Sequence, residues 1–190
     1  MKALWYARLA RPDILKPITA LARHIQKWSI NCDKQLYRLM CYMHSTPDLK
    51  LCGSVNDKLD EVSLQLFVDA DFAGSRDDAK STSGGFLELT GPNTFFPLVW
   101  SSKKQSATSK STAETELVSL NYHLYDEGIP MLDLWQVITG NKNFQLFVEE
   151  DNEATIKIVR QGYSPKLRSI TRTHRVSISA LHEKIGRAHV

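Results

Sequence analysis

Acidic residues stand at the ends of two predicted strands in this chain of 190 residues. The apolar run 64–68 is followed by Asp69, and the run 144–148 is followed by an acidic run that includes Asp151. β-Favouring residues dominate both runs, which predicts strands. If these strands are parallel neighbours in one sheet, their carboxyl ends bring Asp69 and Asp151 together, at the edge where α/β sheets bind ligands. Carboxylates held close together repel each other, and a divalent cation relieves that repulsion.

A predicted helix supplies a third acid. Its apolar stripe consists of Ala113, Leu117, Leu120 and Leu124. Ser111 and Glu114 have the spacing of a capping box at its start, which gives Glu114 a structural role. Glu116 has no such role, and at 100° per residue it lies nearer the apolar stripe than Glu114 does. An acid at the edge of a buried face is explained by a metal ion or a catalytic water.

Each of these acids also has an ordinary structural explanation. An aspartate often ends a strand or caps the helix that follows, and either Asp151 or Asn152 is placed to cap a helix. Glu116 is equally compatible with an exposed position on the flank of its helix. The residues taken singly leave both interpretations open.

The chain divides into two segments with different patterns of apolar residues. Residues 1–60 are predicted to be a helical segment, because apolar residues recur at helical spacing. Strands are expected at 64–68, 85–89, 95–100 and 144–148, and helices at 111–127, 130–138, 152–161 and 173–184. This order predicts an α/β layered domain over residues 61–184.

Composition and charge narrow the class of protein. With 42% hydrophobic and 24% charged residues, a folded globular protein is expected. There is no apolar run long enough to span a bilayer, so no membrane partner is expected. Three cysteines without metal-ligand spacing indicate reduced thiols in an intracellular compartment. Basic segments at 103–110 and 157–184 flank the acidic run 149–153, which suits a polyanionic substrate but also an ordinary solvated surface.

Five motifs occur in an order and spacing that resemble the ribonuclease H domain of copia-type LTR retrotransposons. They read VDADFAG at 68–74, KSTSGGF at 80–86, WSSKKQ at 100–105, STAETE at 111–116 and DNEA at 151–154. The resemblance covers about residues 64–183. The segment ARPDI at 10–14 resembles the end of the reverse transcriptase in the same Pol polyprotein, so residues 1–60 are interpreted as its tail.

The resemblance implies a ribonuclease H-like fold, with a five-stranded mixed sheet and helices on both faces. It implies an endonuclease that cleaves the RNA strand of RNA–DNA hybrids with two Mg²⁺ (or Mn²⁺) ions. Asp69, Glu116 and Asp151 fall on the metal-binding acids of the family, with Asp69 bridging the ions and Asp71 auxiliary.

The same resemblance implies the partners and the location. The partners are the RNA–DNA hybrid and the rest of the Pol polyprotein, including the reverse transcriptase core. The implied location is the cytoplasm, in a virus-like particle, with the nucleus as an alternative. Candidates for contact with the hybrid backbone are Lys103, Lys104 and Arg168, although each also suits an ordinary surface position.

The sequence departs from the family near its end. Ser177 stands where the family has a fourth metal-binding Asp, and a hydroxyl is a poorer Mg²⁺ ligand than a carboxylate. Two hypotheses remain: an active nuclease, and a decayed ribonuclease H-like module that binds nucleic acid or is only structural. A phosphate-binding ATPase domain of the same layer class is a third, but the chain has no glycine-rich phosphate loop. Residues 185–190 match the translation of a common sequencing adapter, so we expect them to pack against nothing.

Overall fold

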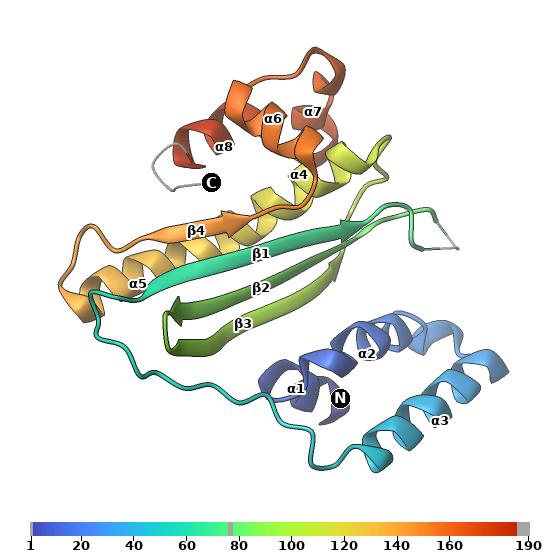
Figure 1. The fold of residues 1–190 in the computed structure, drawn as a ribbon. Coiled ribbons are helices and arrows are strands. Elements are labelled where there is room, and N and C mark those ends of the chain that lie inside the picture. Colours follow the sequence, from blue (N-terminus) through green and yellow to red (C-terminus); the bar gives the residue numbers. More distant parts are fainter. Residues whose placement is uncertain (1, 76–77, 186–190) are drawn as a thin grey trace. The chain divides into compact units, whose positions relative to one another are not determined.

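The computed structural model describes residues 2–75 and 78–185 (Figure 1). The chain forms two compact units, Met1–Cys52 and Gly53–Val190. The second unit begins before residue 61, where the sequence suggested a boundary. The reason is that Ser54 already pairs with Phe95, through backbone hydrogen bonds of 2.7 and 3.0 Å in the two directions.

The first unit is helical, with α1 (Lys2–Leu9), α2 (Leu15–Ala22) and α3 (Ile30–Ser45). Its buried apolar side chains are Ala7, Ile14, Leu15, Ile18, Leu21, Cys32 and Leu39. Arg11 is only 2% exposed; it pairs with Asp13 at 2.8 Å and donates to the carbonyl oxygen of Thr46 at 2.8 Å. The ARPDI motif therefore ties the start of α2 to the end of α3. The three cysteines are free thiols.

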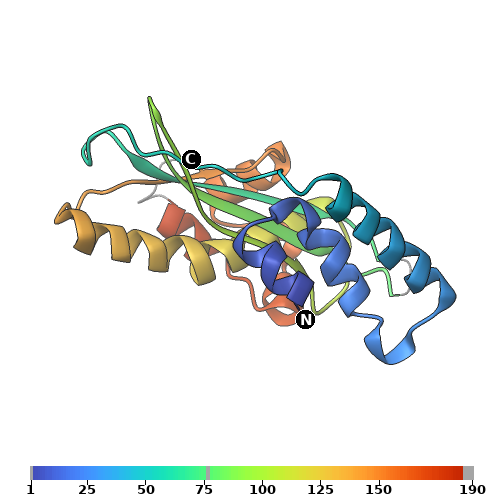
Figure 2. The ribbon, with the colours of Figure 1, turned by 90° about the horizontal axis from the view of Figure 1, so that it is seen from below.

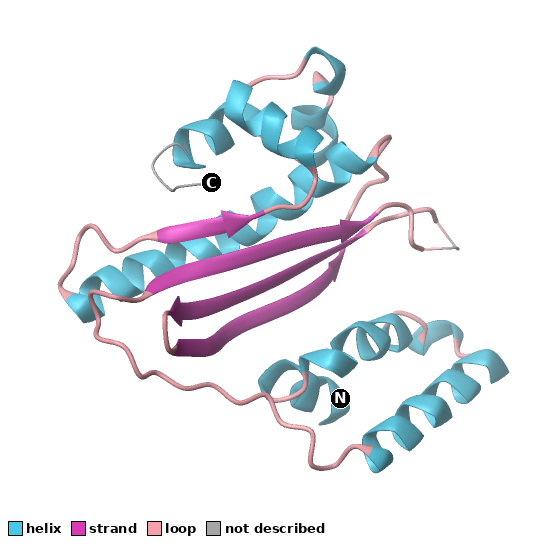
Figure 3. Ribbon diagram, in the orientation of Figure 1, coloured by secondary structure: helices cyan, strands magenta, loops and turns pink. Residues whose placement is uncertain are grey.

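The second unit contains a mixed four-stranded sheet (Figure 3). Its strands are β1 (Ser63–Asp71), β2 (Thr82–Gly91), β3 (Thr94–Lys104) and β4 (Leu146–Glu149). They lie in the order β3-β2-β1-β4, with β1–β2 and β2–β3 antiparallel and β1–β4 parallel.

The expectation of a fifth strand is wrong for the described residues. The segment after α6 (Glu153–Gln161) instead forms a 3₁₀ turn at Pro165–Leu167 and the short helix α7 (Ile170–His174). Pro165 has no backbone N–H to donate to a neighbouring strand. Ile170 and Val176 are 1% exposed and join the apolar core instead of lining a sheet edge.

Among residues 53–75 and 78–185, the helices of the second unit pack on one face of the sheet and not on both faces as expected. Figures 1 and 2 show α4 (Thr112–His123) and α5 (Ile129–Thr139) running along that face. The core between them contains Leu64 and Leu66 of β1 with Leu117 of α4, and α6 and α8 (Ile178–Ile185) add side chains to the same cluster. Within the described ranges, no helix has the length and apolar character needed to cross a membrane.

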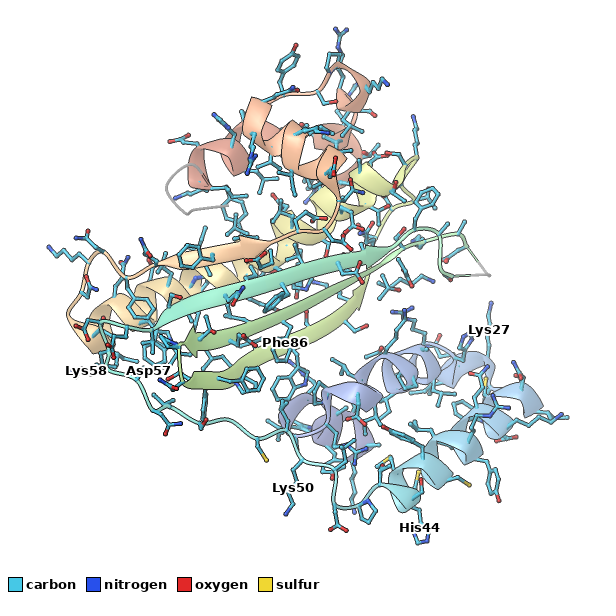
Figure 4. The ribbon with its side chains drawn as sticks, viewed as in Figure 1. Lys27, His44, Lys50, Asp57, Lys58 and Phe86 are labelled. Atoms are coloured by element: carbon cyan, nitrogen blue, oxygen red, sulfur yellow. The ribbon has the colours of Figure 1, made fainter. Side chains whose placement is uncertain are left out.

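Aromatic side chains from three strands form a row on the other face. Phe67 and Phe86 have ring centroids 6.5 Å apart, and Phe86 and Trp100 have theirs 6.4 Å apart. Phe67 is 40% exposed although the residues on either side of it in β1 are buried. Figure 4 shows Phe86 on the sheet, and Asp57 beside the β2–β3 turn, where it accepts a hydrogen bond from the backbone N–H of Asn93 at 2.7 Å.

The last predicted helix, 173–184, is interrupted in the structure. α7 ends at His174, and α8 starts at Ile178, because Arg175 adopts a left-handed conformation with φ +58°. Ile185, predicted to pack against nothing, is the buried last residue of α8, so that part of the expectation is wrong. The remainder of the expectation concerns residues 186–190, which lie outside the described residues.

Candidate metal centre

Asp69 and Asp151 lie where two parallel strands separate. The last paired residues of β1 and β4 are Phe67 and Glu149, and each aspartate lies two residues beyond its strand's last pair. Asp69, Asp151 and Glu116 of α4 each offer a carboxylate oxygen, and these three oxygens lie within 4.8 Å of one another. The two aspartates are exposed, whereas Glu116 is buried. The structure thus brings together the three acids that the sequence selected.

The start of α4 holds Glu116 in place through bonds to the end of β1. The Ser119 hydroxyl donates to the carbonyl oxygen of Asp69 at 2.8 Å, and the backbone N–H of Ala70 donates to the Glu116 carboxylate. Two elements that are distant in sequence are thereby fixed at one point. The position of Glu116 therefore depends on one backbone N–H and on one short serine side chain of its own helix.

Ser111 caps α4 as the sequence predicted, and Glu114 is structural. The Ser111 hydroxyl accepts from the backbone N–H of Glu114 at 3.2 Å. The Glu114 carboxylate accepts from the backbone N–H of Lys110 at 2.7 Å instead of from that of Ser111. Its other oxygen lies 3.6 Å from Nε2 of His174, and both side chains are almost fully buried.

Asn152, and not Asp151, caps α6. The Asn152 side-chain oxygen accepts from the backbone N–H groups of Ala154 and Thr155, at 3.0 and 3.1 Å. The capping explanation for Asp151 therefore does not apply. Its carboxylate remains free to face Asp69 and Glu116.

Burial and mutual repulsion make this group of acids unfavourable without a cation. Glu116 is 5% exposed, and its Oε2 has no hydrogen-bond partner. Burial, followed by the charges of Glu150, Asp69 and Asp151, raises the pKa of Glu116 to about 8. Burial also raises the pKa of Glu150 to about 7, with Asp151 and Asp69 adding to the effect. An all-oxygen set of this kind suits a hard divalent cation such as Mg²⁺ or Mn²⁺.

Glu150 is a residue that the sequence argument did not select. It immediately follows β4 and is half-buried; its Oε1 accepts from the backbone N–H of Asn152 at 3.1 Å. The only signal in the sequence was its place in the acidic run 149–153. Periodicity could not tell which members of that run point inward, since the strand ends there.

Two further residues that the family resemblance selected, Ser177 and Asp71, form hydrogen bonds within their own surroundings. Ser177 starts α8: its hydroxyl accepts from the backbone N–H of Ala180 at 3.3 Å and lies 3.1 Å from the hydroxyl oxygen of Ser179. Asp71 accepts a hydrogen bond from the backbone N–H of Thr82, its partner in β2, and its auxiliary role at the metal site stays a prediction.

The three residues predicted to contact the hybrid backbone differ in their exposure and in their ion pairing. Lys104 forms an ion pair with Asp78 at 2.7 Å and donates to the Ser75 hydroxyl at 3.0 Å. The Nζ of Lys103 lies 4.0 Å from the ring centroid of Tyr122, and the residue is exposed. Arg168 is exposed as well. Lys103 and Arg168 are therefore more accessible to a ligand than Lys104 is.

Comparison with known proteins finds sequence similarity to transposon polyproteins of plants. It is 32% identical over 118 residues to the retrovirus-related Pol polyproteins from transposons RE2 and RE1 of Arabidopsis thaliana, a match that covers 62% of this chain and 8% of each relative. An uncharacterized mitochondrial protein of the same plant is 32% identical over 118 residues, or 46% of its length. Over these 118 residues the chain is similar to retrovirus-related Pol polyproteins from transposons.

This relationship confirms the resemblance to copia-type Pol polyproteins, and none of the relatives' names specifies a ribonuclease H domain. The chain spans only 8% of the length of the RE2 and RE1 polyproteins. No family model matches the chain, and no solved structure matches it.

Proposed function

We propose that the second unit is a ribonuclease H domain of a retrotransposon Pol polyprotein, which cleaves the RNA strand of RNA–DNA hybrids by two-metal-ion hydrolysis. The observation that carries the proposal is the convergence of Asp69, Glu116 and Asp151 at the diverging ends of β1 and β4. The mixed sheet, with three antiparallel strands and a parallel fourth, is compatible with a ribonuclease H-like fold.

Asp69, Glu116 and Asp151 would hold the ions. Bound Mg²⁺ would activate the attacking water and stabilise charge on the attacking and leaving oxygens. The bridging role that the family resemblance implies for Asp69 suits its place near the carboxyl end of β1, an inner strand of the sheet. The bonds from Ala70 and Ser119 keep the carboxylates in position before substrate binds, which lowers the cost of organising the site.

The substrate and partners follow from the same proposal. Lys103 and Arg168 would contact phosphates of the hybrid backbone, and Lys104 would do so only after leaving Asp78. The rest of the Pol polyprotein, including the reverse transcriptase core, would be the covalent or assembled partner. The site of action would be a cytoplasmic virus-like particle, or the nucleus.

The test is cleavage of a hybrid with a labelled RNA strand, in Mg²⁺ and in Mn²⁺. We expect the chain to cleave the RNA strand and Asp69→Asn to abolish the cleavage, because the variant removes the bridging charge. Glu149→Gln is the matched control: Glu149 is an exposed acid of the same run that accepts from Gln65 at 3.0 Å, so this variant should retain activity.

The second candidate function is a module that binds nucleic acid without cleaving it. The observation that favours it is Ser177, whose hydroxyl caps α8 at the position where the family resemblance predicts an acid. A folded chain that binds the hybrid and metal but cleaves in neither Mg²⁺ nor Mn²⁺ would select this alternative.

A further inference from the structure

A buried polar side chain, Gln105, joins the end of β3 to the first turn of α4. Gln105 is 6% exposed and follows Lys104, the last residue of β3. Its Nε2 donates to the carbonyl oxygen of Thr115 and to the hydroxyl of Ser83 in β2, at 3.0 Å each. Its Oε1 accepts from the Ser109 hydroxyl at 3.3 Å. Because a backbone carbonyl can only accept, the nitrogen of the Gln105 amide must face Thr115.

Three of the five sequence motifs meet in this polar cluster. Ser81 and Ser83 belong to KSTSGGF, Gln105 to WSSKKQ and Thr115 to STAETE, and all four residues are buried. The backbone N–H of Gln105 donates to the carbonyl oxygen of Ser81 at 2.8 Å, and the hydroxyl oxygens of Ser81 and Thr115 lie 3.4 Å apart. Buried polar groups need partners inside the protein, and these residues supply them to one another.

The cluster reaches the metal centre through the backbone of α4. Thr115 immediately precedes Glu116, which carries one of the three converging carboxylates. Three residues farther along the helix, the Ser119 hydroxyl donates to the carbonyl oxygen of Asp69 at 2.8 Å. The helix is thus tied to the sheet on both sides of Glu116, to β2 and β3 through Gln105 and to β1 through Ser119. These two ties restrict both sliding and rotation of α4 at Glu116.

Repulsion among the three carboxylates is the force that these ties must resist. Asp69, Glu116 and Asp151 each place an oxygen within 4.8 Å of the others, and like charges at such distances repel. In the metal-free protein this repulsion favours movement of Glu116 away from the two aspartates. A bond to the helical turn that carries Glu116 opposes the movement. Ligands that are already in position bind an ion more tightly, because less reorganisation is needed.

We propose that Gln105 is a positioning residue of the metal centre, which keeps Glu116 within reach of the ions by binding the carbonyl oxygen of Thr115. The inference rests on the proposed function and adds to it a residue that touches neither metal nor substrate. It also gives a role to the glutamine of the WSSKKQ motif. Loss of Gln105 should weaken metal binding although every metal ligand remains.

A purely structural role of the cluster is the competing explanation, and Thr94 provides the comparison. Thr94 is 4% exposed and begins β3, at the end of the strand opposite to Gln105. Its hydroxyl accepts from the backbone N–H groups of Asn56 and Asp57, at 3.2 and 3.1 Å. Thr94→Val therefore removes a buried polar link of the same strand without disturbing the first turn of α4.

The experiment is an Mn²⁺ titration of the metal-free full chain, with free Mn²⁺ measured by electron paramagnetic resonance and urea unfolding of the metal-free protein recorded in parallel. Gln105→Met keeps the length of the side chain and removes its hydrogen bonds. We expect this variant to weaken Mn²⁺ binding about tenfold, the lower end of the effect usual for groups that orient metal ligands. Thr94→Val should also lower stability, but it should bind Mn²⁺ as the wild type does.

Gln105→Asn is the second variant, in case Gln105→Met does not fold. Its amide keeps a polar group in the cluster but is one methylene shorter, so it cannot reach Thr115, and Mn²⁺ binding should again weaken. Wild-type affinity in the folded Gln105 variants would overturn the inference and leave the metal centre in place. Equal weakening in Thr94→Val would overturn it too, because the effect would then follow stability alone. A wild-type chain that binds no Mn²⁺ would overturn the proposed function, and the inference with it.

Discussion

The imidazole of His123 is a buried, neutral link between α4 and β3. Its Nδ1 lies 2.9 Å from the carbonyl oxygen of Ser119, so Nδ1 must carry the proton and donate it. Nε2 is then an acceptor for the Ser101 hydroxyl at 2.7 Å. Both ring nitrogens are satisfied in this tautomer, and a second proton would place a charge on an imidazole that is 0% exposed.

This arrangement makes stability depend on pH. Burial, reinforced by the nearby charge of Lys103, lowers the pKa of His123 to about 4, while the bond to Ser119 and the charge of Asp126 oppose the shift. Between pH 6.5 and about 4 the unfolded chain takes up a proton that the folded chain does not. The contribution of His123 is therefore full above pH 6.5 and is lost as the pH falls through this range. The loss amounts to roughly 3 kcal/mol.

Urea unfolding at pH 7.5 and 4.5 checks this prediction, together with an NMR titration of the imidazole. The pH dependence should be smaller in His123→Gln, which has no titrating group there. Glu127, which also hydrogen-bonds to Ser101, stays in both proteins and so cancels in the comparison. An imidazole that titrates near 6.5 in the folded protein would contradict the assignment.

At the residue scale, the sequence could predict the three converging acids but not their surroundings. Asp69 and Asp151 were identifiable because an acid at the end of an apolar run has a known position in a parallel pair. Glu116 was identifiable from its angle to the apolar stripe of α4. Neither argument could predict that Glu150 is half-buried, because its burial depends on how α4 and α6 pack. The choice of Asn152 over Asp151 as the cap likewise depends on side-chain rotamers.

At the element scale, Gly85 allows α4 to approach β2 closely. A Cβ at this position would overlap the His123 ring, whose Cδ2 is its nearest neighbour. The absence of a side chain on β2 is thus what makes room for the imidazole and its bond to Ser101. The adjacent Gly84 has no such neighbour, since its nearest atom would be the carbonyl oxygen of Asp69 at 3.8 Å.

Gly85→Ala should therefore destabilise the fold by roughly 1–3 kcal/mol, as expected when a methyl group is forced into a filled core. Gly84→Ala is the matched control, and it should change stability by less than about 1 kcal/mol, because the methyl group has space. Chemical denaturation of the two variants measures the difference. Equal losses would show that the ring moves aside at little cost.

Elements with strong periodicity could be predicted, and elements without it could not. The four strands and the helix from Ser111 follow from apolar runs and a capping signal. The break between α7 and α8 has no such signal, because Arg175 takes a left-handed conformation without being glycine. One local bond and one tertiary contact accompany that conformation: the Thr171 hydroxyl donates to the carbonyl oxygen of Val176 at 2.9 Å, and Val176 is buried in the apolar core.

At the scale of the whole molecule, the apolar core of the second unit is self-contained. The core cluster runs from Val62 of the segment before β1 to Ile185 of α8, with no member from the first unit. The three converging acids, Asp69, Glu116 and Asp151, also belong to this unit. We therefore expect the candidate site to form in a chain that starts at Gly53.

We predict that a protein consisting of residues 53–190 folds by itself and binds Mn²⁺ with an affinity within about threefold of the full chain, since its core and its acids are intact. Circular dichroism should show one cooperative thermal transition, as is usual for a single domain of this size. The start at Gly53 is important, because Ser54 pairs with Phe95. A protein that starts at residue 61 is the comparison, and it should melt at a lower temperature because it lacks that pairing and the contacts of Asp57 with Asn93. If residues 53–190 remain unfolded, or fold but lose Mn²⁺, then the first unit contributes to the site and the independence of the two units is wrong.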